Sequence, residues 1–404
     1  MAREIAVFLY LRLISILFAS FRFFPVQRKV VFVASFADNN VSIYQEMQRQ
    51  GVNCRTVFLT TRKVYPHFAG FTGADKLLFD IRHFAQFVTS IYHLATAKVV
   101  FVDNYYGFLA AAAFKEETTC IQLWHANGAV KKFGLEDHST EGRSENARKR
   151  FKQVYDRFDH VVVSSDAMAQ IFQQAFGLSG EKILKTGVPR TDVFFNKNAQ
   201  KQASQKVYQQ YPQLAGKKVV LYAPTYREEQ LDSFELRLNL DLLKKELGND
   251  YALLLRLHPA IKNSVMLNDD LKDFVFDVSG YPSLNDLLFI TDLLISDYSS
   301  IPFEFSLLNK PMLFFPYDLT HYSKTRGLWE DYHQLVPGPV VLSTAEIIKA
   351  IQHHEFDYDR LKGFNHKWNE YAHGESSQNI VAFAKAHLGL EVTEQVKVQS
   401  DLSH

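Results

Sequence analysis

The feature that most constrains the fold is a repeated alternation between short apolar runs and helix-like segments along most of the chain. The apolar runs are rich in Val, Ile, Leu and Phe. Runs of this kind separated by helices predict βα units, which build a mostly parallel sheet covered by helices on both faces. We therefore predict an α/β fold. The expected strands include KVVFVASF, CRTVFLT, AKVVFVD, TTCIQLWHA and FDHVVVSS in the first half, and KVVLYAPT, YALLLRLHP, FVFDVS, LLISDYS, PMLFFPY and PVVLS in the second.

A polar stretch near the middle divides this alternation into two series. Residues 196–218 lack long apolar runs, so we place a domain boundary within or just before them. A length of 404 residues fits two domains. Two doubly wound, Rossmann-like domains can present the carboxyl ends of their strands to one shared cleft. The predicted divisions are an N-terminal helix over 1–27, a first domain over 28–200, a second domain over 201–372, and a C-terminal helix and tail over 373–404.

The first segment, residues 3–24, is apolar enough to raise the question of a membrane span. Arg12 would lie near the middle of such a span at a cost of roughly 2.5–3.5 kcal/mol, and no small-residue cleavage site of a signal peptide precedes the next strand. We predict instead an amphipathic helix at the membrane surface. A helix buried against the first domain is the alternative, because a helix that is apolar nearly all round is usually buried. The cations expected to meet anionic headgroups are Arg3, Arg12, Arg22, Arg28 and Lys29.

Charge and cysteine content exclude several classes of protein. A formal net charge of +1 gives no overall attraction for nucleic acid, so a bound anion must meet a local cluster of donors. The two cysteines, Cys54 and Cys120, lie far apart in apolar contexts, which argues against a disulfide framework and favours a reducing cytoplasm. We find no Walker loop, dinucleotide fingerprint, zincin motif or nucleophile elbow, and no Asp-x-Asp pair placed to hold a divalent metal on a nucleotide diphosphate. No metal is predicted.

Unusual polar residues follow five of the expected strands. Ligands of α/β sheets bind at the carboxyl ends of strands, so five such groups converging on one cleft predict a binding site. They are Trp124-His125, Pro224 to Arg227, Arg256 to Pro259, Ser296 to Ser300, and Pro316 to Asp318.

One of these strand ends has the pattern of a phosphate site. Ser299 and Ser300 fall in the first turn of the helix that follows LLISDYS. Hydroxyls, backbone N–H groups and the helix dipole together bind phosphate. The alternative is that Asp297 or one serine only caps the helix. Glu304, one turn later, suits the hydroxyls of a ribose, although a solvent-facing or salt-bridged glutamate is an ordinary outcome.

Two histidines are candidate catalytic residues. His258 follows Arg256 at a strand end, and the pair suits a phosphate that leaves with negative charge. A lone histidine is more often structural, and the predicted phosphate site shifts the balance toward catalysis. His125 in the first domain would act as a general base on an acceptor hydroxyl. By itself it is equally well explained as a polar residue at the end of a strand.

Six motifs in order resemble the CDP-glycerol glycerophosphotransferase family of teichoic acid synthesis, over residues from about 28 to about 385. The resemblance implies a GT-B fold, with two Rossmann-like domains facing a central cleft and the C-terminal helix packing back toward the first domain. It also implies a peripheral protein on the cytoplasmic face of the membrane of Gram-positive bacteria. The motifs are QLWHANGAVKKFG, TGVPRTD, VVLYAPTYRE, LLLRLHP, LISDYSSIPFEFSLLNKPMLFFPYDL and TRGLWEDY.

The resemblance also implies roles for individual residues. His125 is the base, and His258 with Arg256 stabilises the pyrophosphate and the departing CMP. Lys131 and Lys132 are either solvated or close to the diphosphate of the acceptor. The remaining implied residues are Ser299, Ser300, Glu304, Thr225 and Arg326 on the donor side, and Trp124 and Asn127 on the acceptor side.

Ala126, where many members have Gly, makes the motif more similar to the primase branch of the family. A primase moves sn-glycerol 3-phosphate from CDP-glycerol to the N-acetylmannosamine hydroxyl of an undecaprenyl-diphosphate-linked ManNAc-GlcNAc disaccharide and releases CMP. The motifs require no cofactor besides this donor. The membrane surface and other teichoic acid enzymes are further candidate partners, and nucleic acid is not. His373-Gly374 departs from the Asp-Gly common in the family, which leaves the role of that segment open.

Three alternatives remain at this point. A polymerase that extends a primed acceptor shares the motifs but usually has a longer N-terminal region. A UDP-sugar-dependent glycosyltransferase or epimerase shares the fold, and a non-catalytic assembly partner of other wall-polymer enzymes belongs to a different class. The choice between glycerol and ribitol in the donor, and the oligomeric state, stay open.

Overall fold

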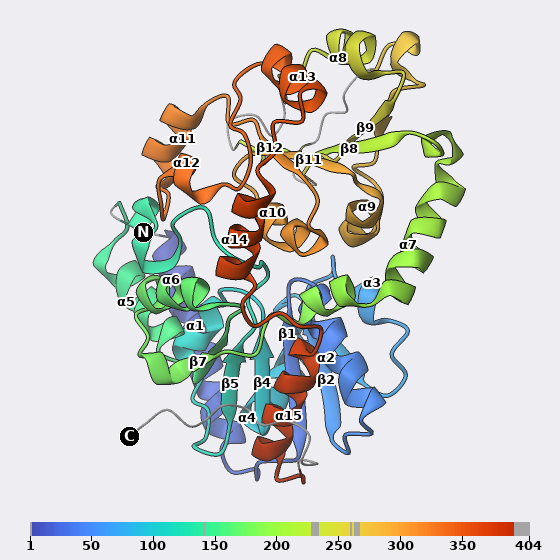
Figure 1. Ribbon diagram of the computed structural model, residues 1–404. Helices are drawn as coiled ribbons and strands as arrows, with labels where there is room; N and C mark the ends of the chain where they lie inside the picture. The colour runs from blue at the N-terminus through green and yellow to red at the C-terminus, as the bar shows by residue number, and fades with distance from the viewer. Residues whose placement is uncertain (1, 141, 228–233, 259–260, 262–266, 392–404) are drawn as a thin grey trace, which may run out of the picture. The chain divides into compact units, whose positions relative to one another are not determined.

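The computed structural model describes residues 2–140, 142–227, 234–258, 261 and 267–391, and it contains two compact α/β units (Figure 1). Unit 1 comprises Met1–Ala126, Phe133–Asp192 and Tyr371–His404, and unit 2 comprises Asn127–Lys132 and Val193–Glu370. Each unit has its own parallel sheet. The assignment of Asn127–Lys132 to unit 2 is a feature that sequence reasoning did not anticipate.

The bounds of the elements follow the expected alternation. Those of unit 1 are α1 (Ala2–Phe21), β1 (Lys29–Ala34), α2 (Asp38–Arg49), β2 (Arg55–Thr60), α3 (Tyr65–Phe68), β3 (Asp75–Leu78), α4 (Phe84–Ala95), β4 (Val99–Val102), the 3₁₀ helix η1 (Gly107–Ala111), β5 (Thr119–Gln122), α5 (Glu145–Tyr155), β6 (His160–Val162), α6 (Asp166–Phe176), β7 (Ile183–Leu184) and α15 (Ser376–Leu388). Those of unit 2 are α7 (Lys197–Gln210), β8 (Lys218–Tyr222), α8 (Leu240–Leu247), β9 (Tyr251–Leu255), β10 (Val275–Asp277), α9 (Leu284–Ile290), β11 (Leu293–Ser296), α10 (Ile301–Phe305), β12 (Met312–Phe314), α11 (Leu319–Arg326), α12 (Tyr332–Leu335), α13 (Thr344–Gln352) and α14 (Tyr358–Trp368).

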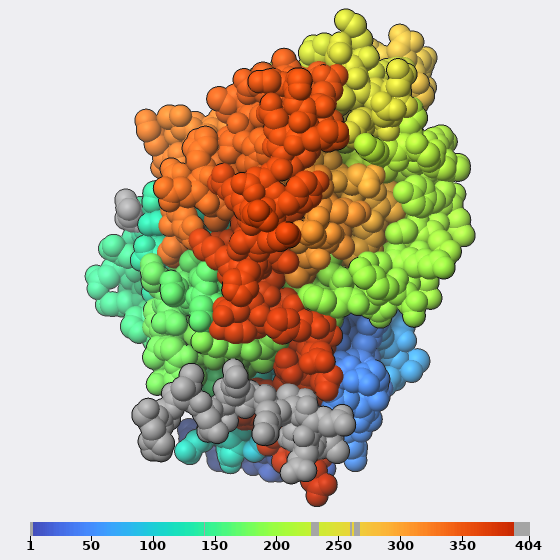
Figure 2. All heavy atoms as spheres, in the orientation of Figure 1, coloured from blue at the N-terminus to red at the C-terminus, as the bar shows by residue number. Residues whose placement is uncertain are grey.

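The sheet of unit 1 has the strand order β3-β2-β1-β4-β5-β6-β7, and every strand pair is parallel. All six residues of β1 are buried, which explains why its sequence is apolar without alternation. β1 is flanked by β2 and β4, so the strand order reverses between β1 and β4, where doubly wound sheets bind ligands. Helices α2 and α15 pack side by side, and their outer surfaces adjoin in Figure 2, in blue and red respectively.

The sheet of unit 2 has the order β10-β9-β8-β11-β12, and its reversal lies between β8 and β11. Its core is built from residues of β8, β9 and β11 together with α8 and α13. Side-chain caps define where helices begin: Asn239, Ser283 and Ser343 each accept an N–H from the first turn of α8, α9 and α13. Each sheet thus has one point at which the strand order reverses, and the carboxyl ends of the strands at that point are where a ligand is expected.

One expected strand of the second series is wrong. PVVLS forms no strand, and Val340 makes only an isolated bridge to Phe314 of β12. Pro339 cannot donate a ladder hydrogen bond. Gly338 passes so close to β12 that a Cβ there would lie 2.0 Å from the carbonyl oxygen of Met312. The segment lies close against β12 but does not form a further strand of the sheet.

The N-terminal helix α1 packs on unit 1 along one face only. Ile14 and Phe18 are buried, and Tyr10 contacts Phe87 of α4. On another face Phe8 and Leu9 are 65% and 60% exposed. The expectation of an amphipathic helix is wrong, because apolar residues occupy the exposed face as well as the packed one. The alternative of a buried helix is also wrong, since only 11% of its apolar window is buried, although it is long and apolar enough to cross a membrane by length and composition.

Candidate active site

At the reversal point of unit 1, the carboxylate of Asp103 joins the ends of β1 and β4. Asp103 is fully buried and accepts hydrogen bonds from the backbone N–H groups of Ser35 and Phe36, at 3.0 and 2.8 Å. It also accepts from Asn40 Nδ2 at 2.8 Å and from the hydroxyl of Tyr106 at 2.6 Å. All four donors are uncharged. Burial raises the pKa of Asp103 to about 6, against the opposing effect of these donors.

His125 follows β5 and is held beside this carboxylate. Its Nδ1 lies 3.2 Å from the carbonyl oxygen of Asp103, which can only accept, so this contact requires a proton on Nδ1. A neutral imidazole then has its basic lone pair on Nε2. The ring stacks between Phe36 and Trp124, with centroids 4.5 and 4.4 Å away. These contacts fix both the orientation of the ring and its tautomer.

The backbone immediately before His125 is in an unusual conformation. Trp124 has φ of 57°, in the left-handed region that costs a non-glycine residue roughly 1–2 kcal/mol. Its N–H donates to Gln122 Oε1 at 2.9 Å, and its carbonyl oxygen accepts from Asn39 Nδ2 at 2.9 Å. Its ring stacks on Phe133 at 4.8 Å. The surrounding structure therefore imposes this conformation, which turns the chain sharply where His125 is presented.

Arg190, from the TGVPRTD motif, fixes the same loop from another side. Its Nη1 donates to the carbonyl oxygen of His125 at 2.9 Å and lies 3.1 Å from Asp38. Its backbone N–H donates to Asn39 Oδ1 at 3.0 Å. Two of the six sequence motifs thus meet at His125 within unit 1.

The segment Asn127–Lys132, which begins two residues after His125, belongs to unit 2. Asn127 is fully buried and donates to Asn369 Oδ1 at 2.5 Å. Gly128 has φ of 75°, and a Cβ there would lie 2.5 Å from the ring of Phe303. Both observations give the segment a packing role, so the predicted contact of Asn127 with the acceptor is not supported by its burial.

Lys131 and Lys132 lie against the TRGLWEDY motif. Lys131 forms an antiparallel bridge with Leu328, and the N–H of Lys132 donates to the carbonyl oxygen of Gly327 at 3.1 Å. The ammonium of Lys132 lies 5.8 Å from the ring of Trp329. The pairing is within unit 2, and both lysine side chains are partly exposed.

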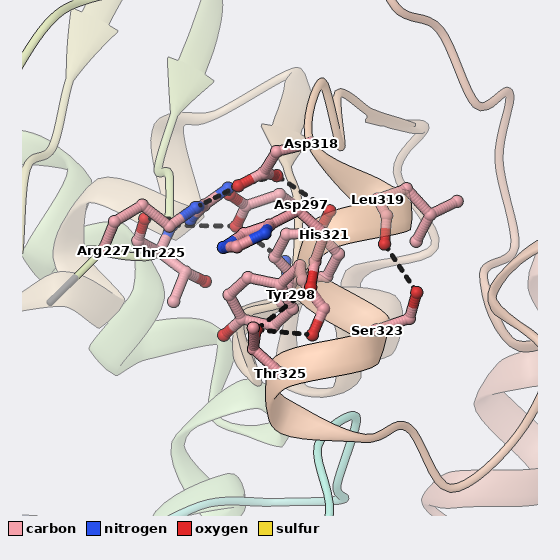
Figure 3. A network of polar contacts seen from close by, with 10 residues as sticks. Thr225, Arg227, Asp297, Tyr298, Asp318, Leu319, His321, Ser323 and Thr325 are labelled. Atoms are coloured by element: carbon pink, nitrogen blue, oxygen red, sulfur yellow. Dashed lines mark hydrogen bonds and ion pairs between the residues drawn. The ribbon is translucent and has the colours of Figure 1, made fainter. Parts of the chain in front are cut away.

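At the reversal point of unit 2, the guanidinium of Arg227 contacts the carboxylates of Asp297 and Asp318 (Figure 3). Arg227 Nε donates to Asp318 Oδ2 at 2.7 Å, and its Nη2 lies 2.9 Å from Asp318 Oδ1 and 3.1 Å from Asp297 Oδ2. Asp297 also accepts from the N–H of Thr225 at 2.8 Å. Burial lowers the pKa of Arg227, but the hydrogen bonds to Asp318 and the charge of Asp297 outweigh burial and raise its pKa above the ordinary value. Arg227 therefore joins the chain segments after β8, β11 and β12.

Tyrosine rings surround this guanidinium. The rings of Tyr298 and Tyr322 stack 3.7 Å apart, and Arg227 lies 5.1 and 5.0 Å from their centroids. Tyr298 donates its hydroxyl to Asp318 at 3.0 Å, and Tyr332 donates to the carbonyl oxygen of Asp297 at 2.8 Å. The network rigidifies the strand ends on which the predicted donor residues sit.

Two predicted donor-side residues of β9 have different surroundings. Arg256 Nη1 donates to the carbonyl oxygens of Val278, Ser279 and Tyr281 at 2.6 to 2.7 Å, so it holds the loop after β10. His258 is exposed, with its ring 4.5 Å from that of Tyr226. The exposure of the His258 side chain is compatible with contact with a ligand. The expected strand-ending Pro259 lies outside the described residues.

The predicted phosphate-binding residues lie at and after the start of α10. Ser299 Oγ accepts the N–H of Ile301 at 3.2 Å, while the N-cap of α10 is Ser300, whose side chain makes no cap hydrogen bond. Ser300 is partly exposed at the N-cap position. Glu304 is buried, 3% exposed, so the alternative of a solvent-facing glutamate is wrong. Arg326 ends α11, close enough to lower the pKa of Tyr322, which burial raises to a larger extent.

The structure brings together some predicted residues and adds others. Trp124 and His125 lie together in unit 1, and Thr225 joins Asp297 in unit 2. Sequence reasoning placed Arg227 and Asp318 in strand-end groups of the predicted site but gave them no role, and it did not select the central residues of the unit 1 network. Among the described residues, no group of three or more His, Cys, Asp or Glu side chains is placed to hold a metal ion. The residues not selected from the sequence are Asp103 and Arg190.

Comparison with known proteins gives a consistent result. Residues 16–384 match the family model described as CDP-glycerol:poly(glycerophosphate) glycerophosphotransferase. The chain is 37% identical over 357 residues to the teichoic acid glycerol-phosphate primase of Bacillus subtilis (strain 168), covering 88% of this chain and 91% of that protein. It is 34% identical over 376 residues to the primase of the same name from Bacillus spizizenii (strain W23), covering 93% and 97%. The solved structure of the wall teichoic acid polymerase TagF is similar with a TM-score of 0.79 at 25% identity, over 96% of this chain and 98% of that chain.

Proposed function

The chain belongs to the CDP-glycerol:poly(glycerophosphate) glycerophosphotransferase family, and from this premise we propose that it is a glycerol-phosphate primase. It transfers sn-glycerol 3-phosphate from CDP-glycerol to the N-acetylmannosamine hydroxyl of an undecaprenyl-diphosphate-linked ManNAc-GlcNAc disaccharide, and CMP leaves. The observation that carries the proposal is the match to two primases over 91% and 97% of their own lengths. The polymerase alternative is weaker because the chain covers 57% of the poly(ribitol-phosphate) polymerase of Bacillus spizizenii, against 91% and 97% of the two primases.

In the proposed mechanism His125 is the general base. Its Nδ1 proton is committed to the carbonyl of Asp103 at 3.2 Å, so Nε2 accepts the proton of the acceptor hydroxyl. The hydroxyl oxygen attacks the β-phosphorus of CDP-glycerol, the bond from this phosphorus to the bridging oxygen breaks, and CMP leaves with the electron pair. Such a displacement depends mainly on positioning and on charge stabilisation.

On the donor side, His258 with Arg256 and the hydroxyls of Ser299 and Ser300 are proposed to stabilise the diphosphate. Glu304 is proposed to meet the ribose. The exposure of His258 and the partial exposure of both serines support contact with a ligand. The proposed base His125 belongs to unit 1 and the proposed donor residues belong to unit 2, so we propose the GT-B arrangement with a shared cleft. The likeness to TagF over most of both chains supports this arrangement.

We further propose that α1 lies in the membrane interface on the cytoplasmic face. Its exposed side carries Ile5, Phe8, Leu9 and Ile16, each at least 54% exposed, while its other side packs on α4. Burying those side chains among lipids removes apolar surface from water. The fraction of protein that floats with vesicles containing anionic lipid should fall when Phe8 and Leu9 are changed to Ser. An unchanged fraction would contradict the proposal.

The function is tested by CMP release. Purified protein with CDP-glycerol and the lipid-linked disaccharide should release CMP, and omission of either substrate should abolish release. CDP-ribitol and UDP-sugars serve as donor controls. Preference for CDP-ribitol would move the assignment to a ribitol enzyme, and turnover of UDP-sugars would overturn the glycerophosphotransferase proposal.

A further inference from the structure

Unit 1 contains an open cavity of about 250 Å³ that the proposed mechanism does not use. It lies at the carboxyl edge of the sheet, where the ends of β1 and β2 form its floor. Thr60 and Thr61 line it from β2 and the residue after it, and Phe79 lines it from the residue after β3. Tyr106, from the loop after β4, and Tyr10 of α1 also line it.

The lining indicates a neutral ligand with hydrogen-bonding groups. Its residues are Tyr, Phe, Thr, Val, Ala, Leu and Gly, and none of them is charged, so nothing in the lining neutralises a diphosphate. Aromatic walls with a few placed hydroxyls are typical of sites for small organic ligands. The volume lies just under the range of roughly 300–1,000 Å³ for such sites, which leaves room for one ring and not for a long chain.

Thr60 supplies an independent observation that a polar ligand belongs here. The residue is 1% exposed, and its hydroxyl has no hydrogen-bond partner within the part of the chain that the structure describes. Buried polar atoms are nearly always paired, and an unpaired one is costly. A ligand hydroxyl or acetamido group in the cavity would satisfy Thr60 Oγ1.

The lining of the cavity includes residues linked to the proposed base and to helix α1. Tyr106 lines the cavity and donates its hydroxyl to the carboxylate of Asp103 at 2.6 Å, while the backbone carbonyl of Asp103 contacts His125 Nδ1. Tyr10, another lining residue, belongs to α1, the helix with exposed apolar side chains. A sugar in this cavity would therefore contact one residue joined to the network of His125 and one residue of the helix that we propose to contact lipid.

We propose that this cavity binds the sugar ring adjacent to the reacting one in the lipid-linked acceptor, with a hydroxyl or acetamido group of that sugar bonded to Thr60. The inference rests on the proposed function. It assigns the neutral inner sugar to the cavity, the diphosphate to charged groups outside it, and the polyprenyl chain to the bilayer.

The test is a steady-state comparison of Thr60→Val with Thr56→Val in the full-length protein. The valine at position 60 preserves shape and removes the hydroxyl, and Thr56 is a buried threonine of the same strand that does not line the cavity. T60V should raise the KM for the disaccharide lipid about three- to tenfold, the loss of one hydrogen bond, with the KM for CDP-glycerol unchanged. T56V should leave both constants unchanged.

A binding measurement separates failure of this inference from failure of the proposed function. Saturation-transfer NMR with the soluble methyl glycoside of the disaccharide should show contact of the inner sugar with wild-type protein, reduced in T60V, whether or not turnover occurs. Equal KM values for T60V and T56V would overturn the inference. So would a T60V penalty that disappears when only the prenyl chain is shortened, because the cavity would then hold lipid.

Discussion

At each of the two reversal points, one charged side chain joins the ends of neighbouring strands, but the side chain is an acid in unit 1 and a base in unit 2. In unit 1 the carboxylate of Asp103 joins the ends of β1 and β4, with His125 attached through its carbonyl, and every hydrogen bond described to the side chain comes from an uncharged donor. In unit 2 the guanidinium of Arg227 joins the segments after β8, β11 and β12 through two carboxylates.

This difference indicates where proton transfer can occur. Burial raises the pKa of Asp103 to about 6, so the edge of unit 1 contains a carboxyl group that changes charge near neutral pH. Arg227 stays charged, and its role in unit 2 is to hold strand ends in place. The proposed base, His125, therefore lies at the edge with uncharged donors, and the proposed donor residues lie at the edge that is held by ion pairs.

The largest expected effect is on turnover, from His125→Ala. Removing a general base lowers the rate about 10²- to 10⁴-fold, and the fold should persist because the neighbouring strand ends are joined through Asp103. CMP release with saturating substrates measures the loss, and circular dichroism checks the fold. His138→Ala, an exposed histidine later in the same connection, is the matched control. Turnover of H125A within threefold of wild type would end the assignment of proton transfer to unit 1.

The next effect is on stability, from Arg227→Ala. The change leaves the carboxylate of Asp297, 2% exposed, without its ion pair, and breaking a buried pair costs about 3–5 kcal/mol. Urea unfolding followed by circular dichroism measures the free energy of unfolding. Arg227→Lys should lose less, because it keeps the charge but not the two-pronged contact with Asp318. A loss below about 1 kcal/mol in R227A would mean that unit 2 does not depend on this network.

The smallest effect is a pH dependence in unit 1. The folded-state pKa of Asp103, about 6, exceeds the value of about 3.9 expected in the unfolded chain, so the folded state binds this proton more tightly. Its contribution to stability is fully present below about pH 4 and is lost as the pH rises through 6, by roughly 3 kcal/mol.

The comparison with Asp103→Asn isolates this contribution, since Asn does not titrate. The difference in free energy of unfolding, wild type minus D103N, should fall between pH 4 and pH 7. A difference that stays constant or rises over that interval would show that Asp103 is stabilised as an anion, as Asp318 of unit 2 is, where burial raises the pKa but the contacts with Arg227 lower it below its ordinary value.

Much of the fold was accessible from the sequence because parallel strands buried on both faces are apolar throughout. The runs at Lys29–Ala34 and Tyr251–Leu255 are of this kind. PVVLS has the same composition and fails because Pro339 and Gly338 prevent a regular ladder. The face of α1 was mispredicted because arginines at intervals suggested a polar side that the helix does not have.

The candidate site was accessible only in part. His125 and Ser299 were recognisable because each lies three residues after the end of an apolar strand. The partners that hold the networks together were not, since Arg227 and Asp318 are 91 residues apart and Arg190 and His125 are 65 apart. Patterns of residues within a short stretch of sequence do not predict contacts between residues so far apart in the chain. The placement of Asn127–Lys132 in unit 2 likewise depends on packing against Phe303 and Leu328, far along the chain.

The most direct test of the central claim is the mass of the lipid product. Purified protein is incubated with excess CDP-glycerol and one defined ManNAc-GlcNAc diphosphate lipid, and the products are resolved by mass spectrometry. The primase proposal predicts that each acceptor gains a single glycerol phosphate and that the reaction then stops. A ladder of products with successive glycerol phosphates, or transfer only to an acceptor that already carries one, would contradict it.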